Sequence, residues 1–397
     1  MVSNRQLFLD HIAQTSPDPF LLEIESAKGI FLFGPERKKY FDIIAGVSVS
    51  ALGHGHPAIT RAVKEQVDRY MHVMVYGELI QSPQINYAKL LSSTLGEGFD
   101  NTYFLNSGSE AIEGVIKLAR KATGRSEVVS FRNAYHGSTL GALSVMGGSY
   151  YKQGYHPLIP DTRQIEYNSF KDLDQITTKT ACVIAEPIQG EAGIIMPASN
   201  FLRDLRERCN QTGALLIFDE IQTGFGRTAE LFAFRKFGVT PDVIVLAKSL
   251  GGGMPLGAFI TRKEIMKILS DKPVLGHITT FGGHPVSCAA GLACLKTILK
   301  DKLNETVADK EQLFRKHLDH PAIKEIRGTG LLLAIELGSQ ELMLKTIRCA
   351  LKNGVMTDWF LFCNTAIRIS PPLIINSGEI ITVCNLIKQS IDEATKI

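Results

Sequence analysis

Two residues in the second half of the chain place an amine and an acid at the ends of apolar segments. Lys248 directly follows the apolar run 243–247, and Asp219 follows the apolar run 214–218. Burying an ammonium group is costly, so burial lowers the pKa of a lysine and favours its neutral amine. A neutral lysine amine can form a Schiff base with a carbonyl compound. The sequence therefore predicts a lysine-centred site whose ligand is a cofactor aldehyde.

Asp219 is the second anchor of this predicted site. A buried carboxylate needs a cationic partner or several hydrogen-bond donors. A protonated pyridine nitrogen would suit it and would let the ring accept electrons. The alternative partner is a nearby arginine such as Arg227. Gln222, three residues after Asp219, could donate to a phenolate oxygen of the same ring.

Two further segments could hold parts of a flat anionic ligand. Ser107 and Glu110 have the spacing of a capping box, and Gly108 allows close approach to the backbone. A helix amino terminus binds anions such as phosphate, although a plain helix cap is the alternative interpretation. Tyr135 follows the next strand and could stack on a heterocycle or pack beneath a loop. His136 alone indicates no more than a satisfied polar residue.

These residues require a sheet to bring them together. From about residue 100 to 262, short apolar segments alternate with amphipathic helices, which predicts an α/β fold with a mainly parallel sheet. In such sheets, ligands bind beyond the carboxyl ends of the strands, where Asp219 and Lys248 would both lie. The expected strands are 102–105, 127–131, 182–185, 214–218, 243–247 and 257–261.

The end of the chain has a different pattern. A long helix is expected after Pro285, then strands at 331–337 and 366–370, and a closing helix from Gly378. Because 397 residues exceed the usual size of a single core, we expect two domains. The predicted division is an N-terminal segment 1–55 that joins the small domain, a large α/β domain 56–290, and a small α+β domain 291–397.

Composition excludes several classes of function. A net charge of +3 without a long basic run gives no support for nucleic-acid binding. No segment has the apolar length of a signal peptide core or a membrane span, so we expect no membrane partner. The seven cysteines are scattered and form no Cys-x-x-Cys pair. This pattern predicts a reduced, cytoplasmic protein without a metal site.

Taken together, these segments resemble the class III branch of the pyridoxal-phosphate-dependent aminotransferases, from about residue 20 to the end. The resemblance implies the fold type I of these transferases: a mainly parallel seven-stranded sheet with helices on both faces, plus a smaller α+β domain. The strings that carry it are IFDEIQTGFGR at 217–227, AKSLGGG at 247–253, EPIQGE at 186–191, TTFGG at 279–283 and RISPPL at 368–373.

The resemblance implies a role for each matching position. Lys248 would hold the cofactor, pyridoxal 5'-phosphate, as a Schiff base and carry a proton between substrate and cofactor. Asp219 would keep the pyridine nitrogen protonated. Thr280 would bind the phosphate of a neighbouring subunit, which implies a homodimer with shared active sites. The other implied contacts are ring packing by Tyr135 and Ile221, a hydrogen bond from Gln222, phosphate binding by Gly108 and Ser109, and support from Glu186 and His136.

The resemblance also implies a reaction, the ping-pong transfer of an ω-amino group from an ornithine- or acetylornithine-type donor to 2-oxoglutarate. Arg368 would bind a substrate carboxylate, a role suited to a bidentate guanidinium, and Thr279 would also contact substrate. Glu191 would neutralise Arg368 when an ω-amine is bound. The pair would thus let one site accept two unlike amino donors.

Ser138 departs from the acetylornithine and ornithine members, in which an arginine that binds substrate carboxylate commonly follows the His-Gly pair. Ser138 is short and uncharged, so this clamp is missing or supplied by another residue such as Arg132. The departure leaves open 4-aminobutyrate, or another ω-amino acid or amine, as the donor. An aminomutase, a decarboxylating transaminase and a non-catalytic cofactor-binding protein are further alternatives, the last disfavoured by Lys248 and Asp219.

Overall fold

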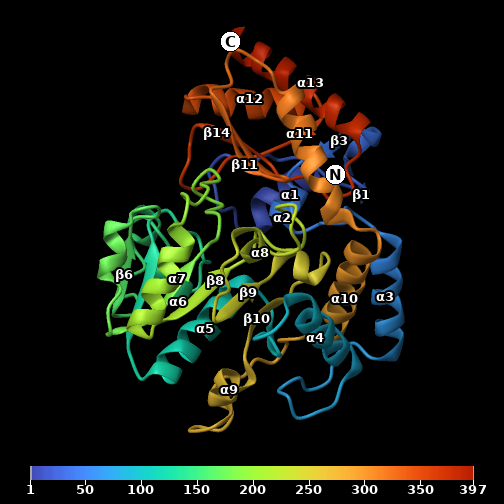
Figure 1. Cartoon of the computed structure of the whole chain (residues 1–397). Helices are drawn as coiled ribbons and strands as arrows, with labels where there is room; N and C mark the ends of the chain where they lie inside the picture. The colour runs from blue at the N-terminus through green and yellow to red at the C-terminus, as the bar shows by residue number, and fades with distance from the viewer. Residues whose placement is uncertain (1, 397) are drawn as a thin grey trace.

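The computed structural model describes residues 2–396 and is built around a seven-stranded sheet with the order β4-β10-β9-β8-β7-β5-β6 (Figure 1). Only β10 is antiparallel to its neighbours, so the predicted mainly parallel α/β sheet is confirmed. The strands are β4 (Asn101–Leu105), β5 (Glu127–Phe131), β6 (Thr162–Ile165), β7 (Thr180–Ala185), β8 (Leu215–Asp219), β9 (Val243–Leu246) and β10 (Gly257–Thr261).

Alternate residues of the central strands pack into two different hydrophobic cores. In β9, Val243 and Val245 pack with helices α5 and α6, whereas Ile244 and Leu246 pack on the opposite face with α4, α7 and α10. Because both faces are covered, β9 is apolar at every position and the strands beside it are mainly apolar. The helices of this part are α3 (Pro57–Arg69), α4 (Ser82–Leu95), α5 (Gly108–Thr123), α6 (Leu140–Val145), α7 (Phe201–Thr212), α8 (Ala233–Phe237), α9 (Lys263–Met266) and α10 (Pro285–Lys300).

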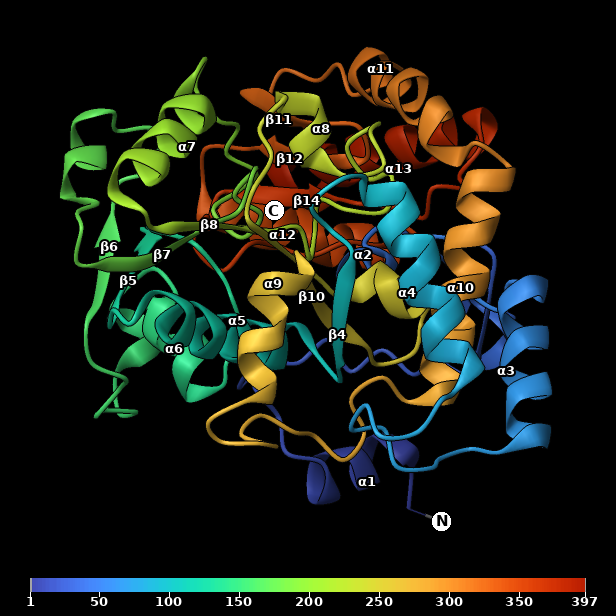
Figure 2. The same ribbon diagram turned by 60° about the horizontal axis from the view of Figure 1, so that its bottom comes forward.

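The smaller α+β part combines the two ends of the chain above the large sheet (Figure 1). One sheet has the antiparallel order β11-β12-β14, and the other has the order β1-β2-β3-β13, in which β3 pairs in parallel with β13. The strands are β1 (Ser26–Lys28), β2 (Phe31–Phe33), β3 (Lys39–Asp42), β11 (Glu325–Thr329), β12 (Leu332–Glu336), β13 (Val355–Met356) and β14 (Ala366–Ile369). The helices are α2 (Ala45–Ser48), α11 (Val307–His317), α12 (Gln340–Lys352) and α13 (Ser377–Lys396), whereas the short helix α1 (Asn4–His11) lies apart from them, at the bottom of Figure 2.

The division between the two parts runs close to helix α10. This helix continues from Pro285 to Lys300 and packs against α3 and α4, so a boundary at residue 290 would cut it. Because domain boundaries fall in linkers, we propose that the C-terminal part begins after Lys300. The amide of Ser370 donates to the Ile43 carbonyl at 2.7 Å, which ties the N-terminal segment to the same part. None of the described helices is long and apolar enough to span a membrane.

Candidate active site

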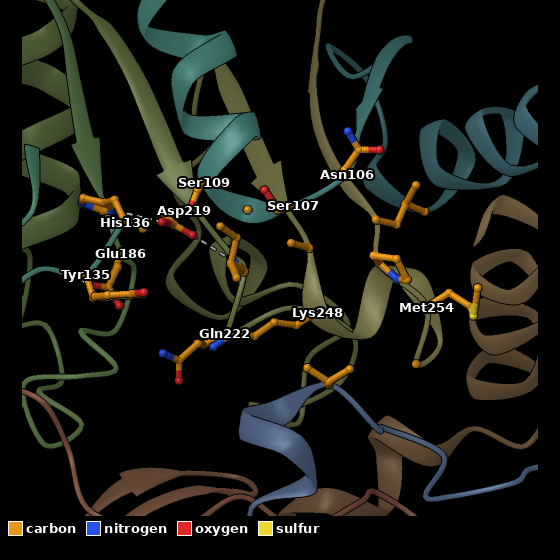
Figure 3. Close-up of a pocket in the computed structure, with 18 residues that line it drawn as sticks. Asn106, Ser107, Ser109, Tyr135, His136, Glu186, Asp219, Gln222, Lys248 and Met254 are labelled. Atoms are coloured by element: carbon orange, nitrogen blue, oxygen red, sulfur yellow. Dashed lines mark hydrogen bonds and ion pairs between the residues drawn. The ribbon is translucent and has the colours of Figure 1, made fainter. Parts of the chain in front are cut away.

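Two parallel strands deliver Asp219 and Lys248 to the same edge of the sheet (Figure 3). Asp219 is the last residue of β8 and lies opposite Val245 of β9, and Lys248 opens the 3-10 turn η4 (Lys248–Gly251) just beyond β9. The φ angle of Lys248 is 51°, in the left-handed region that non-glycine residues rarely adopt. Such backbone strain is concentrated at functional sites, so it supports the interpretation of this edge as a site.

A cavity of about 370 Å³ opens at this edge, within the size range of small-ligand pockets. Both Lys248 and Asp219 line it. The other predicted site residues that line it are Gly108, Ser109, Tyr135, His136, Glu186, Ile221 and Gln222.

The pKa of the Lys248 amine lies close to neutral pH. Burial lowers the pKa of Lys248 to about 8, although the charges of Glu191, Asp219 and Glu186 act in the opposite direction. At this pKa, a usable fraction of the amine is neutral at physiological pH, as nucleophilic attack on a carbonyl requires.

The carboxylate of Asp219 is held by His136. The Nδ1 atom of His136 lies 2.7 Å from Oδ2 of Asp219, and the Ile221 amide donates to Oδ1 at 3.0 Å. Burial favours neutral His136, but its hydrogen bond to Asp219 and the charges of Asp219 and Glu186 raise its pKa. Arg227, the alternative partner, donates instead to the Leu331 and Pro371 carbonyls. The side-chain partner of Asp219 is therefore His136 and not Arg227.

Glu186 fixes the loop that carries Tyr135. Its carboxylate accepts hydrogen bonds from the amides of Tyr135 at 3.0 Å and Gly190 at 2.8 Å. Burial raises the pKa of Glu186 to about 7, despite the opposing charge of His136. A carboxyl group with this pKa can change protonation near neutral pH beside His136 and Asp219.

The start of α5 has a glycine at its first position and leaves backbone amides free. Ser107 Oγ accepts from the Glu110 amide at 3.2 Å, but the Glu110 carboxylate accepts from the Asn106 amide rather than that of Ser107, so only half of the predicted capping box forms. The helical ladder begins when the Ala111 amide donates to the Ser107 carbonyl, which leaves the Gly108 amide outside it.

Glycine is required on both sides of this helix start. A Cβ at Gly108 would lie 2.7 Å from Cδ1 of Ile221, and a Cβ at Gly137 would lie 2.1 Å from Oγ of Ser109. The two glycines thus keep Ser109 and Ile221 close to the cavity while leaving space for an anion at the helix amino terminus.

Glu191 and Arg368 form a buried bidentate ion pair beside Gln222. The Nη1–Oε1 and Nη2–Oε2 distances are both 2.9 Å. Burial opposes the charge of Glu191, but Arg368 holds its pKa down to about 2. Gln222 donates to Oε1 of Glu191 at 3.0 Å, so this side chain joins the lining of the cavity to the ion pair.

The remaining predicted residues lie at or beyond the rim. Thr279 accepts from the Asn106 side chain at 3.0 Å, and Thr280 is exposed. Oγ of Ser138 is 3.3 Å from the hydroxyl of Tyr135. Arg132, considered as a substitute for the missing clamp, pairs with Glu166 at 2.7 Å on the surface. No arginine is present among the described residues that line the cavity.

Sequence reasoning missed several residues at the site, of which three are informative. Val49 follows the left-handed turn Ala45–Ser48 and lines the cavity, and Met254 lines it from the glycine-rich segment after Lys248. Asp358 lies 2.9 Å from Nε of Arg368. The glycine run could have indicated Met254, but the sequence contains no signal for a left-handed turn or for a second carboxylate on Arg368.

The comparisons with known proteins agree with one another. The sequence model of the family described as Aminotransferase class-III matches residues 12–391. The acetylornithine aminotransferase of Methanopyrus kandleri is 38% identical over 91% of this chain and 92% of its own.

Solved structures are similar over the whole fold. An ornithine aminotransferase from Toxoplasma gondii, whose active site holds pyridoxal phosphate at partial occupancy, has a TM-score of 0.91 and 29% identity, covering 98% of this chain and 93% of its own. A thermostable omega transaminase mutant from Pseudomonas jessenii has a TM-score of 0.91 and 26% identity, covering 100% of this chain and 99% of its own.

Proposed function

This chain belongs to the class III aminotransferases, and we propose that it moves an ω-amino group from an ornithine- or acetylornithine-type donor to 2-oxoglutarate. As a member of this family it is a pyridoxal-phosphate-dependent ω-amino transaminase. The observation that carries the proposed choice of substrates is the buried, bidentate Glu191–Arg368 pair next to the Lys248 cavity. It supports a site that alternates between a carboxylate and an amine.

The residues of the cavity fit pyridoxal phosphate. The amides at the start of α5 suit its phosphate, and the absence of a Cβ at Gly137 leaves room beside Ser109. Buried Asp219, whose partner is a histidine, suits a protonated ring nitrogen. When bound, pyridoxal phosphate supplies an aldehyde that condenses with amines and a ring that withdraws electrons from the reacting carbon.

The side chains of this chain then have distinct tasks. Lys248 would hold the cofactor through its neutral amine and would afterwards accept and return a proton at Nζ. Asp219, oriented by His136, would stabilise positive charge on the ring nitrogen. Tyr135 and Ile221 would pack against the ring and exclude water.

The Glu191–Arg368 pair separates the two half-reactions. With an ω-amine donor in the site, Glu191 stays on Arg368 and no free guanidinium attracts an α-carboxylate. With 2-oxoglutarate, Glu191 moves away and Arg368 binds the carboxylate with two parallel hydrogen bonds. Gln222 can follow either arrangement because it contacts Glu191 and also lines the cavity.

A donor without a second carboxylate is the other candidate. Ser138 bonds to Tyr135 rather than offering a cation, and Arg132 is engaged by Glu166 outside the cavity. A thermostable omega transaminase variant engineered for the synthesis of bulky amines, with 26% identity and a TM-score of 0.87, supports amines as candidate donors. We therefore include simple ω-amino acids and amines among the donors to be tested.

A homodimer in the cytoplasm completes the proposal. Two adjacent segments, 71–80 and 274–281, expose large apolar side chains, and the rings of His72 and Phe281 lie 4.9 Å apart between them (Figure 2). Exposed apolar patches of this kind mark protein interfaces. Thr280 lies in the second segment, in keeping with its proposed contact with a neighbouring active site. The seven free cysteines support a reducing compartment.

A panel of donors tests the substrate proposal. Purified protein saturated with pyridoxal phosphate is incubated with acetylornithine, ornithine, 4-aminobutyrate or an alkyl amine, with and without 2-oxoglutarate, and glutamate is quantified. We expect glutamate only when both substrates are present, with acetylornithine or ornithine as the best donor. Turnover without a 2-oxo acid, or release of carbon dioxide, would exclude the proposed reaction.

A further inference from the structure

Arg368 has a second carboxylate partner besides Glu191. Oδ1 of Asp358 lies 2.9 Å from Nε of Arg368, and its side chain is 18% exposed. The two carboxylates bind different edges of the guanidinium, since Glu191 bonds to Nη1 and Nη2. One edge can therefore exchange partners while the other remains occupied.

The Asp358 edge is fixed by the backbone. The amide of Arg368 donates to the Asp358 carbonyl at 2.9 Å, and Nη2 donates to the Trp359 carbonyl at 3.1 Å. The ring of Phe360 lies beneath the guanidinium, 4.5 Å from its central carbon. Asp358 and Arg368 are thus held together within one small β-structure, whereas Glu191 approaches from a separate loop of the large part.

The charges around Arg368 do not cancel. One guanidinium faces Glu191 and Asp358, so the cluster has a net charge of −1 when both carboxylates are ionised. Burial raises the pKa of Asp358, whereas the positive charges of Arg368 and Lys248 act in the opposite direction. If Glu191 leaves, Arg368 and Asp358 together are neutral rather than +1. A substrate carboxylate then binds a guanidinium whose charge Asp358 already neutralises, so the attraction is weaker. A cationic donor instead approaches the negatively charged cluster of Glu191, Arg368 and Asp358.

We propose that Asp358 is a specificity-determining residue that weakens the binding of the dicarboxylate acceptor and favours the cationic amino donor. The proposal rests on the proposed function, in which Arg368 binds a substrate carboxylate. Asp358 acts through Arg368 and sets the balance between the two substrates. The negative charge of Asp358 also promotes release of the dicarboxylate product, glutamate. Glutamate therefore does not remain bound and block the next amino donor.

The test is Asp358→Asn, which can keep the hydrogen bond to Nε while removing the charge. Binding of glutarate, an unreactive dicarboxylate, is measured by calorimetry on protein saturated with pyridoxal phosphate. We expect the variant to bind glutarate roughly three- to tenfold more tightly, as expected for removing one unit charge within several ångströms in a medium of intermediate dielectric. The KM for the amino donor should rise. If Asp358 only positioned Arg368, glutarate would bind equally or more weakly, which would overturn the proposal.

A matched control comes from the same small sheet. Glu336 pairs with Arg327 at 2.8 Å and does not contact Arg368, so Glu336→Gln should leave glutarate affinity unchanged. If Asp358→Asn does not fold, Asp358→Ser removes the same charge with a smaller side chain and is expected to tighten glutarate binding likewise. Absence of glutarate binding in wild type and variant alike would contradict the acceptor assignment, whereas equal binding would contradict the role of Asp358 alone.

Discussion

Lys248 and Asp219 lie at the ends of the neighbouring strands β9 and β8, yet their surroundings act on them differently. Burial lowers the pKa of Lys248 to about 8, whereas Asp219 is paired with His136 at 2.7 Å. The site therefore keeps an amine available in its neutral form beside a carboxylate with a fixed partner. That combination suits a cofactor with both an aldehyde and a basic ring nitrogen.

The lowered pKa of Lys248 should be visible in its reactivity. Only the neutral amine reacts with acylating reagents, so labelling of Lys248 in cofactor-free protein should rise with pH, reach half of its maximum near pH 8 and then level off. Unperturbed lysines, with a pKa of about 10.4, should continue to gain reactivity beyond that pH. Mass spectrometry after short labelling pulses at several pH values measures both. A Lys248 profile that follows the other lysines would contradict the effect of burial.

Replacing Glu191 tests the exchange at Arg368. In Glu191→Ala, the guanidinium loses its bidentate partner and attracts substrate carboxylates, so use of glutamate should rise relative to the ω-amine by roughly tenfold, equivalent to about 1.4 kcal/mol. Half-reaction rates with each donor give this ratio. Glu166→Ala, which removes a carboxylate from the surface pair with Arg132, is the control. An unchanged ratio would remove Glu191 from the switch.

Individual residues were predictable where they interrupt an apolar run. Lys248 and Asp219 both do so, and each lies at the cavity. Asp358 gave no such signal, because it lies between Thr357 and Trp359 and meets Arg368 only through a pairing between segments. The sequence also could not show whether Arg132 replaces the missing carboxylate clamp. Its partner, Glu166, lies after a different strand, so the pair forms only in the folded protein.

At the scale of elements, strands buried on both faces were easy to identify and exposed ones were not. Strand β9 is apolar throughout and β7 is apolar after Thr180, and both lie where they were expected. The edge strand β6 reads Thr-Arg-Gln-Ile and is only partly buried, so it has no apolar signature. The left-handed turn Ala45–Ser48 was equally hidden, because three of its four residues are not glycine.

The contact between the start of α5 and the Tyr135 loop can be tested by a substitution at Gly137. In Gly137→Ala, the new Cβ would lie 2.1 Å from Oγ of Ser109, so Ser109 must move and the affinity for pyridoxal phosphate should fall. Such overpacking should also destabilise the protein by about 1–3 kcal/mol. Equilibrium dialysis and denaturant unfolding measure the two effects.

Gly124→Ala provides the matched control. Gly124 has a positive φ of 66° at the end of α5, and a Cβ there meets no atom within 4 Å. This variant should lose about 1–2 kcal/mol from the left-handed backbone alone and keep its cofactor affinity. If both variants bound pyridoxal phosphate like wild type, the proposed phosphate position would be wrong.

At the scale of the molecule, the proposed dimer surface exposes large apolar side chains of segments 71–80 and 274–281. Ile80 is 94% exposed, so Ile80→Asp should dissociate the proposed dimer and reduce activity, because the proposed contact of the partner's Thr280 with each site would be lost. Light scattering coupled to gel filtration reports the mass. Ile381→Asp, on the exposed side of α13, is the control. A monomeric wild type, or an Ile80→Asp variant that stays dimeric and active, would contradict this arrangement.

The proposed mechanism depends on Lys248 as the residue that holds the cofactor. Borohydride reduction of the protein saturated with pyridoxal phosphate, followed by peptide mapping, identifies the attached lysine. We expect one pyridoxyl adduct, on the peptide that contains Lys248. Lys152, whose pKa is also lowered by burial, is the informative competitor. An adduct on Lys152 or any other lysine, or no adduct after reconstitution, would contradict the account.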